Sequence, residues 1–171
     1  MNIVVPDKFV FSPFFKEGDC IRFDSTVTIE DGSIFVFEIA AEEGLPFDKP
    51  WNKREKTVPI ILQMWKQNKD SIASLFRQRK RKEAGPPMVT NTARFLSILF
   101  WMNETYLSSL QQYTVQIEAL RRKPVNVVER LDFILEQPDH YHSFIQLSEL
   151  YEEVEKLFEK TMIMKKTHLL D

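Results

Sequence analysis

The stretch "FLSILFWM" (Phe95–Met102) gives the strongest indication of the fold, because it is apolar on nearly every side of a helix. At about 100° per residue its large side chains leave only a narrow polar strip. A helix that is apolar nearly all round must have neighbouring elements on several sides. The sequence therefore predicts a helix through this stretch at the centre of a helical bundle.

The segment upstream of this stretch predicts an amphipathic neighbour. From Thr57 onward, apolar residues recur at helical spacing, while polar residues fall on the opposite arc. The segment "EAGPP" (83–87) is expected to end this helix, because its two prolines cannot donate backbone hydrogen bonds. The apolar arc contains Val58, Ile61, Leu62, Trp65, Ile72, Leu75 and Phe76.

The central helix itself is expected to begin near Thr90, a residue type that caps helix N-termini. After Asn103 its apolar stripe narrows, so the later part is expected to lie closer to the surface. Arg121, Arg122 and Lys123 follow, where positive charge suits the C-terminal end of a helix dipole. The narrower stripe consists of Leu107, Leu110, Tyr113, Ile117 and Leu120.

Two further helices are predicted from capping patterns. Asn126 followed by Glu129 is expected to open a helix that ends before Pro138. Ser143 followed by Gln146 is expected to open the last helix. We predict a mainly α, single-domain protein (1–171) whose helical bundle spans residues 57–171. The last apolar stripe contains Phe144, Leu147, Leu150, Tyr151, Val154, Leu157 and Phe158.

Residues 1–56 form an irregular N-terminal part in this prediction. In "VTIEDGSIFVF" (27–37), Asp31 and Gly32 are typical of the tight turn of a small β-hairpin. A short helix through "IFVFEIAAEEG" (34–44), ended by Gly44, fits the same region equally well. The pattern leaves both alternatives open.

Composition excludes several classes of function. The chain has 171 residues, a net charge of −2, four glycines and one cysteine. Few glycines argue against phosphate-cradling loops, and one cysteine excludes an intramolecular disulfide.

The longest apolar run is too short to cross a bilayer, and the N-terminus lacks the features of a signal peptide. These features predict a soluble, cytoplasmic protein without a membrane contact.

The stretch "QPDHYH" (137–142) is where a metal or a proton-transfer site is conceivable. Asp139, His140 and His142 are metal-ligand residue types, but a site needs three or more ligands that converge on one point. We interpret the stretch as a corner between two helices and expect no bound metal or cofactor. The sequence contains no other catalytic motif. A metal-dependent enzyme with its site at these three residues is therefore kept as an alternative function, ranked third after the two that are described below.

The run "RQRKRK" (77–82) carries five positive charges in six residues. Positive residues at a helix end stabilise the helix dipole, which accounts for part of the run. The excess makes Arg77, Arg79, Lys80, Arg81 and Lys82 candidate contacts for an anion or a nucleic acid. Any such binding is expected to be weak and independent of base sequence, and it defines an alternative nucleic-acid-associated function.

Three segments resemble the YpoC-like family of small proteins from Bacillus-type bacteria. They are "DKPW" (48–51), "FWMNE" (100–104) and "KPVNVVERLDFILEQPDHYHSFIQLSEL" (123–150). The resemblance implies a small, cytoplasmic, helical protein without an assigned activity or assigned functional residues. Because no catalytic constellation is present, the leading hypothesis is a non-enzymatic protein that binds a protein partner or regulates one. A small-molecule substrate is not expected.

Overall fold

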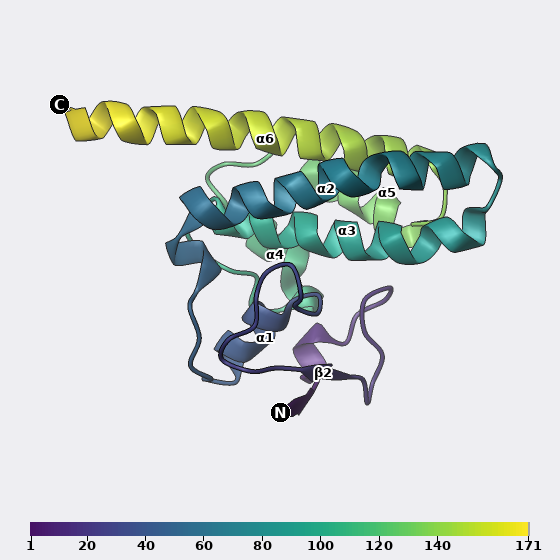
Figure 1. Cartoon of the computed structure of the whole chain (residues 1–171), viewed down its shortest axis with the longest axis horizontal. Helices are drawn as coiled ribbons and strands as arrows, with labels where there is room; N and C mark the ends of the chain where they lie inside the picture. Colours follow the sequence, from purple (N-terminus) through teal and green to yellow (C-terminus); the bar gives the residue numbers. More distant parts are fainter. Residues whose placement is uncertain (171) are drawn as a thin grey trace.

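The computed structural model describes residues 1–170 and the side chains of residues 1–168. The protein is mainly α-helical, as predicted, with one small sheet near the N-terminus. Figure 1 shows α2, α3 and α6 running alongside one another, with the N-terminal part packed below them. The helices are α1 (Val36–Glu42), α2 (Arg54–Arg77), α3 (Arg81–Trp101), α4 (Tyr113–Glu118), α5 (Val127–Glu136) and α6 (Tyr141–Leu170). The strands are β1 (Asn2–Val4) and β2 (Cys20–Arg22), and 3₁₀ turns lie at Asp7–Phe9, Pro50–Asn52 and Leu110–Gln112.

The central position of Phe95–Met102 is confirmed. Every residue of this stretch is buried. α3 packs against α2 and α6, and its last residue, Trp101, meets Phe37 of the N-terminal part with ring centroids 6.0 Å apart. The core is therefore continuous between the bundle and the N-terminal part.

The predicted break at residues 83–87 is wrong, because α2 ends earlier, at Arg77. Arg79 adopts a left-handed backbone conformation, with a φ of 57°. Its N–H donates to the Phe76 carbonyl (3.0 Å), and the Lys80 N–H donates to the Leu75 carbonyl (2.8 Å). This pair of bonds is the Schellman motif, which normally has glycine at the left-handed position.

α3 begins at Arg81 rather than near Thr90, and both Pro86 and Pro87 lie inside it. Each proline leaves the carbonyl four residues earlier without a helical donor. Those carbonyls belong to Lys82 and Glu83, which are exposed, so water can supply the missing donors. The prolines are tolerated because they lie in the first turns of the helix.

The central helix also ends earlier than expected. α3 stops at Trp101, and Glu104 in the following irregular segment has a positive φ of 60°. The Asn103 amide donates to the Leu99 carbonyl (2.8 Å), which satisfies one of the last free acceptors of the helix. The prediction that the later stripe lies closer to the surface is wrong for its side chains, because Leu107, Leu110 and Ile117 are fully buried.

In the N-terminal part, the helical alternative for residues 34–44 is confirmed. α1 ends before Gly44, which adopts a positive φ of 69°. Residues 27–37 do not form a hairpin. The small antiparallel sheet instead pairs Asn2 of β1 with Arg22 of β2.

The two C-terminal helices form where they were predicted, with different details at their first residues. α5 ends before Pro138, but the Asn126 side chain makes no capping bond. α6 begins at Tyr141, and the Ser143 hydroxyl lies inside it, donating to the Gln137 carbonyl (2.6 Å). Figure 1 shows that the C-terminal part of α6 continues past the other helices. Within residues 1–170, no helix combines the length and apolarity needed to cross a membrane.

Candidate functional site

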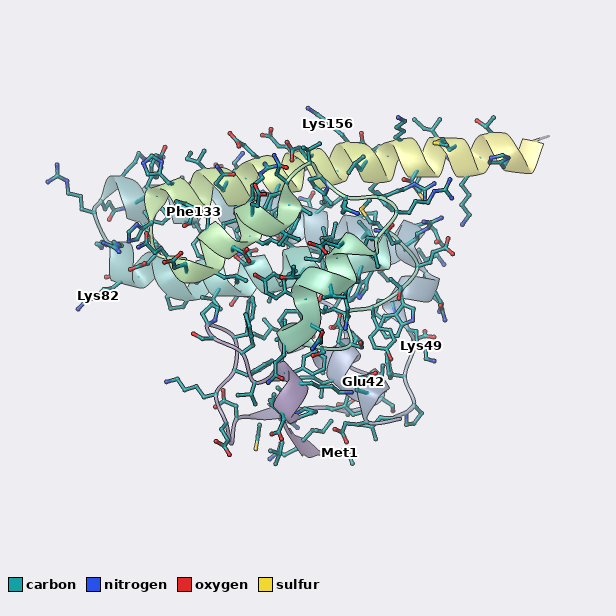
Figure 2. The ribbon with its side chains drawn as sticks, turned by 180° about the vertical axis from the view of Figure 1, so that it is seen from behind. Met1, Glu42, Lys49, Lys82, Phe133 and Lys156 are labelled. Carbon is teal, nitrogen blue, oxygen red and sulfur yellow. The ribbon has the colours of Figure 1, made fainter. Side chains whose placement is uncertain are left out.

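The five predicted anion-contact residues lie on the turn between α2 and α3, which we call the basic turn (Arg77–Lys82). All five side chains are exposed, and Figure 2 shows Lys82 at the tip of the bundle, pointing away from it. Arg81 forms an ion pair with Asp139, in which its Nε lies 3.0 Å from Asp139 Oδ2. The turn therefore presents its charges at an exposed end of the bundle.

The residues of the "QPDHYH" corner contact the basic turn. Asp139 forms the ion pair with Arg81, whose guanidinium also contacts the His140 imidazole. His142 is exposed in the first turn of α6. Across residues 1–170, no three His, Cys, Asp or Glu side chains are grouped so that they could share a metal ion. The guanidinium of Arg81 places a fixed positive charge at this corner, which disfavours a cation there.

At the opposite end of the bundle, a second group of cations surrounds a concave surface, which we call the basic pocket. Its volume is about 360 Å³. The N-terminus of α2, the connector after α4 and the C-terminal part of α6 form its walls. It is lined by Arg54, Arg121, Arg122, Thr161, Met164, Lys165 and His168.

Arg54 is the buried member of the basic pocket, with 9 % of its side chain exposed. One Nη donates to the Met102 carbonyl (2.7 Å), and the other pairs with Glu104 Oε1 (2.6 Å). Its Nε is buried without an acceptor among the residues that the structure describes. The side chain thus ties α2 to the end of α3 and retains one unsatisfied donor.

The backbone of Arg122 is fixed by the Asn103 side chain. Asn103 Oδ1 accepts from the Arg122 N–H (3.0 Å), and Asn103 Nδ2 donates to the Arg122 carbonyl (2.9 Å). Lys123 instead donates to the carbonyls of Glu118 (3.0 Å) and Leu120 (2.7 Å). Only Lys123 therefore plays the helix-end role that was expected for all three residues, and Arg121 and Arg122 line the pocket.

The charge of the basic pocket is positive. Glu104 offsets Arg54, whereas Arg121, Arg122 and Lys165 have no ion pair within 4.0 Å in the part of the chain that the structure describes. Sequence reasoning missed this group because its members come from three segments far apart along the chain. The "RRK" triplet was the one local signal, and it has an ordinary helix-end explanation.

A second polar feature lies between α1 and α3, where the carboxyl of Glu38 is fully buried. Trp101 Nε1 donates to Glu38 Oε2 (2.9 Å), while Oε1 has no donor among the described residues. Burial raises the pKa of Glu38 to about 7. Arg94 and Ser97 also line the adjoining cavity of about 30 Å³, which is large enough for one water molecule. The group can gain or lose a proton near neutral pH.

Comparison with known proteins gives a family and no established activity. The family model described as YpoC-like protein matches residues 55–166. The chain is 32 % identical over 143 residues to the uncharacterized protein YpoC of Bacillus subtilis (strain 168), covering 84 % of this chain and 85 % of that protein. No solved structure matches the chain. The family-model match includes the segments at residues 100–104 and 123–150 and begins after the segment at residues 48–51, and the chain belongs to the YpoC-like family.

Proposed function

We propose that this protein is a non-enzymatic interaction protein that binds and regulates a protein partner through the C-terminal part of α6. We call residues 159–168 the projecting end. The observation that supports this proposal is that the helix continues past the bundle and exposes Ile163 (65 %) and Met164 (44 %). A partner that covers these two side chains would remove apolar surface from water.

The inner face of the projecting end explains why it remains helical. Thr161 is buried and Met162 is half-buried against the core, so this part of α6 is anchored. Beyond Met164 the helix has little tertiary support, and such turns contribute little stability in water by themselves. A protein partner would supply that support.

The charge of the projecting end indicates what the partner surface carries. Lys160, Lys165 and Lys166 are exposed there, and Glu159 is the acidic residue beside them. Complementary charge accelerates association and selects against partners of the same sign. We therefore expect a partner surface with an apolar centre and an acidic rim.

Site-specific photo-crosslinking in the native bacterium tests this proposal. A photoreactive amino acid replaces Ile163 in one strain and Val115 of α4 in the other, because the two residues are equally exposed (65 % and 63 %). We expect a discrete protein adduct from position 163 alone, lost when Lys160 and Lys166 are changed to Glu. Equal adducts from both positions, or none from position 163, would contradict the proposal.

The exposure of the basic turn favours a second candidate, a nucleic-acid-associated function. Arg77, Arg79, Lys80 and Lys82 remain free of ion pairs in the described part of the chain, although Arg81 is paired with Asp139. Four free cations at an exposed end of the bundle suit contacts to phosphates, without base readout. A salt titration with duplex DNA tests this candidate and is described below.

A further inference from the structure

We propose that the basic pocket is a binding site for a phosphate-class oxyanion: inorganic phosphate, pyrophosphate or a phosphate monoester. This inference goes beyond the proposed function, because it assigns a small anionic ligand to a pocket that the projecting end shares with Arg54, Arg121 and Arg122. Its basis is the convergence of four basic side chains on one concave surface: Arg54, Arg121, Arg122 and Lys165.

The buried guanidinium of Arg54 is the first reason. A buried charge is costly unless it is paired, and its partner in the ion pair, Glu104, is 62 % exposed on its side chain. An ion pair with so exposed a carboxylate is weak, so a multiply charged anion can compete for the guanidinium.

The second reason is that one wall of the pocket, the connector that carries Arg122, is held in place before any ligand binds. The two hydrogen bonds from Asn103 fix the backbone of Arg122, and Lys123 is bonded to the end of α4. Arginine presents a planar fork of donors that matches phosphate oxygens in pairs. A preformed site loses less entropy when an anion binds.

The third reason is the N-terminus of α2, a helix of 24 residues that starts at Arg54. The unpaired backbone N–H groups and the dipole of such a helix favour an anion beside its first turn. Glu55 and Glu104 line a neighbouring pocket, which shares Arg54 and Lys165 with the basic pocket. Neither glutamate lines the basic pocket.

The charge and size of the pocket favour phosphate over a single carboxylate. Arg121, Arg122 and Lys165 together supply three positive charges without an ion pair within 4.0 Å among the described residues. Each of these positive charges attracts a dianion or trianion more strongly than a carboxylate, because the carboxylate carries a single negative charge. The volume of about 360 Å³ is within the range of small-molecule sites.

Isothermal titration calorimetry of the full chain with pyrophosphate and with orthophosphate, at constant ionic strength, tests the inference. We expect saturable one-to-one binding with a Kd near or below about 1 mM. Changing both Arg121 and Arg122 to Ser should weaken it by at least about tenfold, because charge-assisted hydrogen bonds are lost. Lys165→Ser provides an independent variant, and Arg54 stays intact because it also holds the end of α3.

The matched control changes Arg79 and Lys80 of the basic turn to Ser, which removes the same number of charges from the other end. This variant should bind pyrophosphate like the unchanged protein, and circular dichroism should show that both variants are folded. Equal weakening in the two double variants would show non-specific attraction and overturn the site. Absence of saturable binding in the unchanged protein would overturn it as well.

A second arm distinguishes a free phosphate from a lipid headgroup. Vesicles of phosphatidylcholine with and without phosphatidic acid are incubated with the protein, with pyrophosphate as competitor. Displacement of the protein from phosphatidic acid by pyrophosphate supports the same pocket for both sources, and binding of the free ion alone assigns the pocket to soluble ligands. Vesicle binding that pyrophosphate does not displace, together with no binding of the free ion, would overturn the inference.

Discussion

Basic residues are arranged differently at the two ends of the helical bundle. At the turn end, the cations of Arg77–Lys82 are adjacent in the sequence and exposed around the turn between α2 and α3. At the pocket end, cations from three distant segments converge on one concave surface, and one of them, Arg54, is buried. Charges that are adjacent along a chain need not face one point, while charges that the fold brings together around a pocket can contact one ligand.

The pocket end also buries its ionisable groups against the last turn of α3. Arg54 donates to the Met102 carbonyl, and Glu38 accepts from Trp101. At the turn end, Arg81 pairs with Asp139 where both side chains remain partly exposed (56 % and 35 %). The pocket end therefore couples charge to stability, whereas the turn end does not.

The largest expected effect is the loss of stability when a buried side chain is shortened at either end of the bundle. It tests whether the two ends are packed equally well and differ only in their charges. Leu99 lies near the pocket end and Ile72 near the turn end, and both are buried. Leu99→Ala and Ile72→Ala should each lower the free energy of unfolding by about 2–5 kcal/mol, because each leaves a cavity. Urea denaturation measures both. A cost below about 1 kcal/mol at either site would mean that the ends differ in packing as well.

The pH dependence of stability comes next, and it concerns Glu38. The folded pKa of about 7 exceeds the ordinary value of 4.5, so the folded state binds the proton more tightly than the unfolded state. The stabilisation is fully present below pH 4.5 and is lost as the pH rises through about 7. The loss amounts to about 3 kcal/mol at about 1.4 kcal/mol per pH unit.

Urea denaturation at a series of pH values checks this expectation. Glu38→Gln should remove the part of the slope that lies between pH 4.5 and 7, while Glu43→Gln, at an exposed position just after α1, should leave it unchanged. A Glu38→Gln variant with the slope of the unchanged protein would show that this carboxyl is not the source.

Arg54→Met is expected to have a smaller effect. It leaves the buried Met102 carbonyl without its guanidinium donor, which should lower the free energy of unfolding by about 1–3 kcal/mol. Arg79→Met in the basic turn should change it by less than about 0.5 kcal/mol, since that side chain is exposed. Thermal or urea denaturation compares the pair, and equal costs would remove the distinction between the two ends.

The smallest expected effect is the binding of duplex DNA by the basic turn. Contact with about four phosphates gives a log–log salt slope near −3.6, at about −0.9 per phosphate. Binding should then weaken about 150-fold between about 50 and 200 mM salt. Changing Arg79 and Lys80 to Ser should reduce the slope to about −1.8, as fluorescence anisotropy would show. Sub-micromolar binding near physiological salt that these substitutions abolish would instead make the nucleic-acid function the leading one.

Much of the fold could be predicted from periodicity, because burial requires a regular apolar stripe. The all-round apolar character of Phe95–Met102 correctly placed it at the centre, and the stripe in α6 was correct along its length. The break between α2 and α3 could not be predicted, since Arg79 is not a residue type that favours a left-handed conformation. Pro86 and Pro87 were misleading, because prolines in the first turns of a helix leave exposed carbonyls that water satisfies.

The candidate site was less predictable than the fold. The sequence drew attention to residues 77–82 because their charges are contiguous, whereas Arg54, Arg122 and Lys165 are separated by more than forty residues at each step. Only the antiparallel course of α2 and α3, together with the length of α6, brings them together. Tertiary convergence of this kind has no local signature in a single sequence.

The most direct test of the different roles of the two ends is an NMR titration that observes both at once. Backbone amide shifts of the ¹⁵N-labelled full chain are followed as pyrophosphate is added at constant ionic strength. The account predicts saturable shifts at Arg54, at Arg121 and Arg122, and at residues 161–168, with residues 77–82 unchanged. Shifts gathered at residues 77–82, or the absence of saturable shifts around the basic pocket, would contradict it.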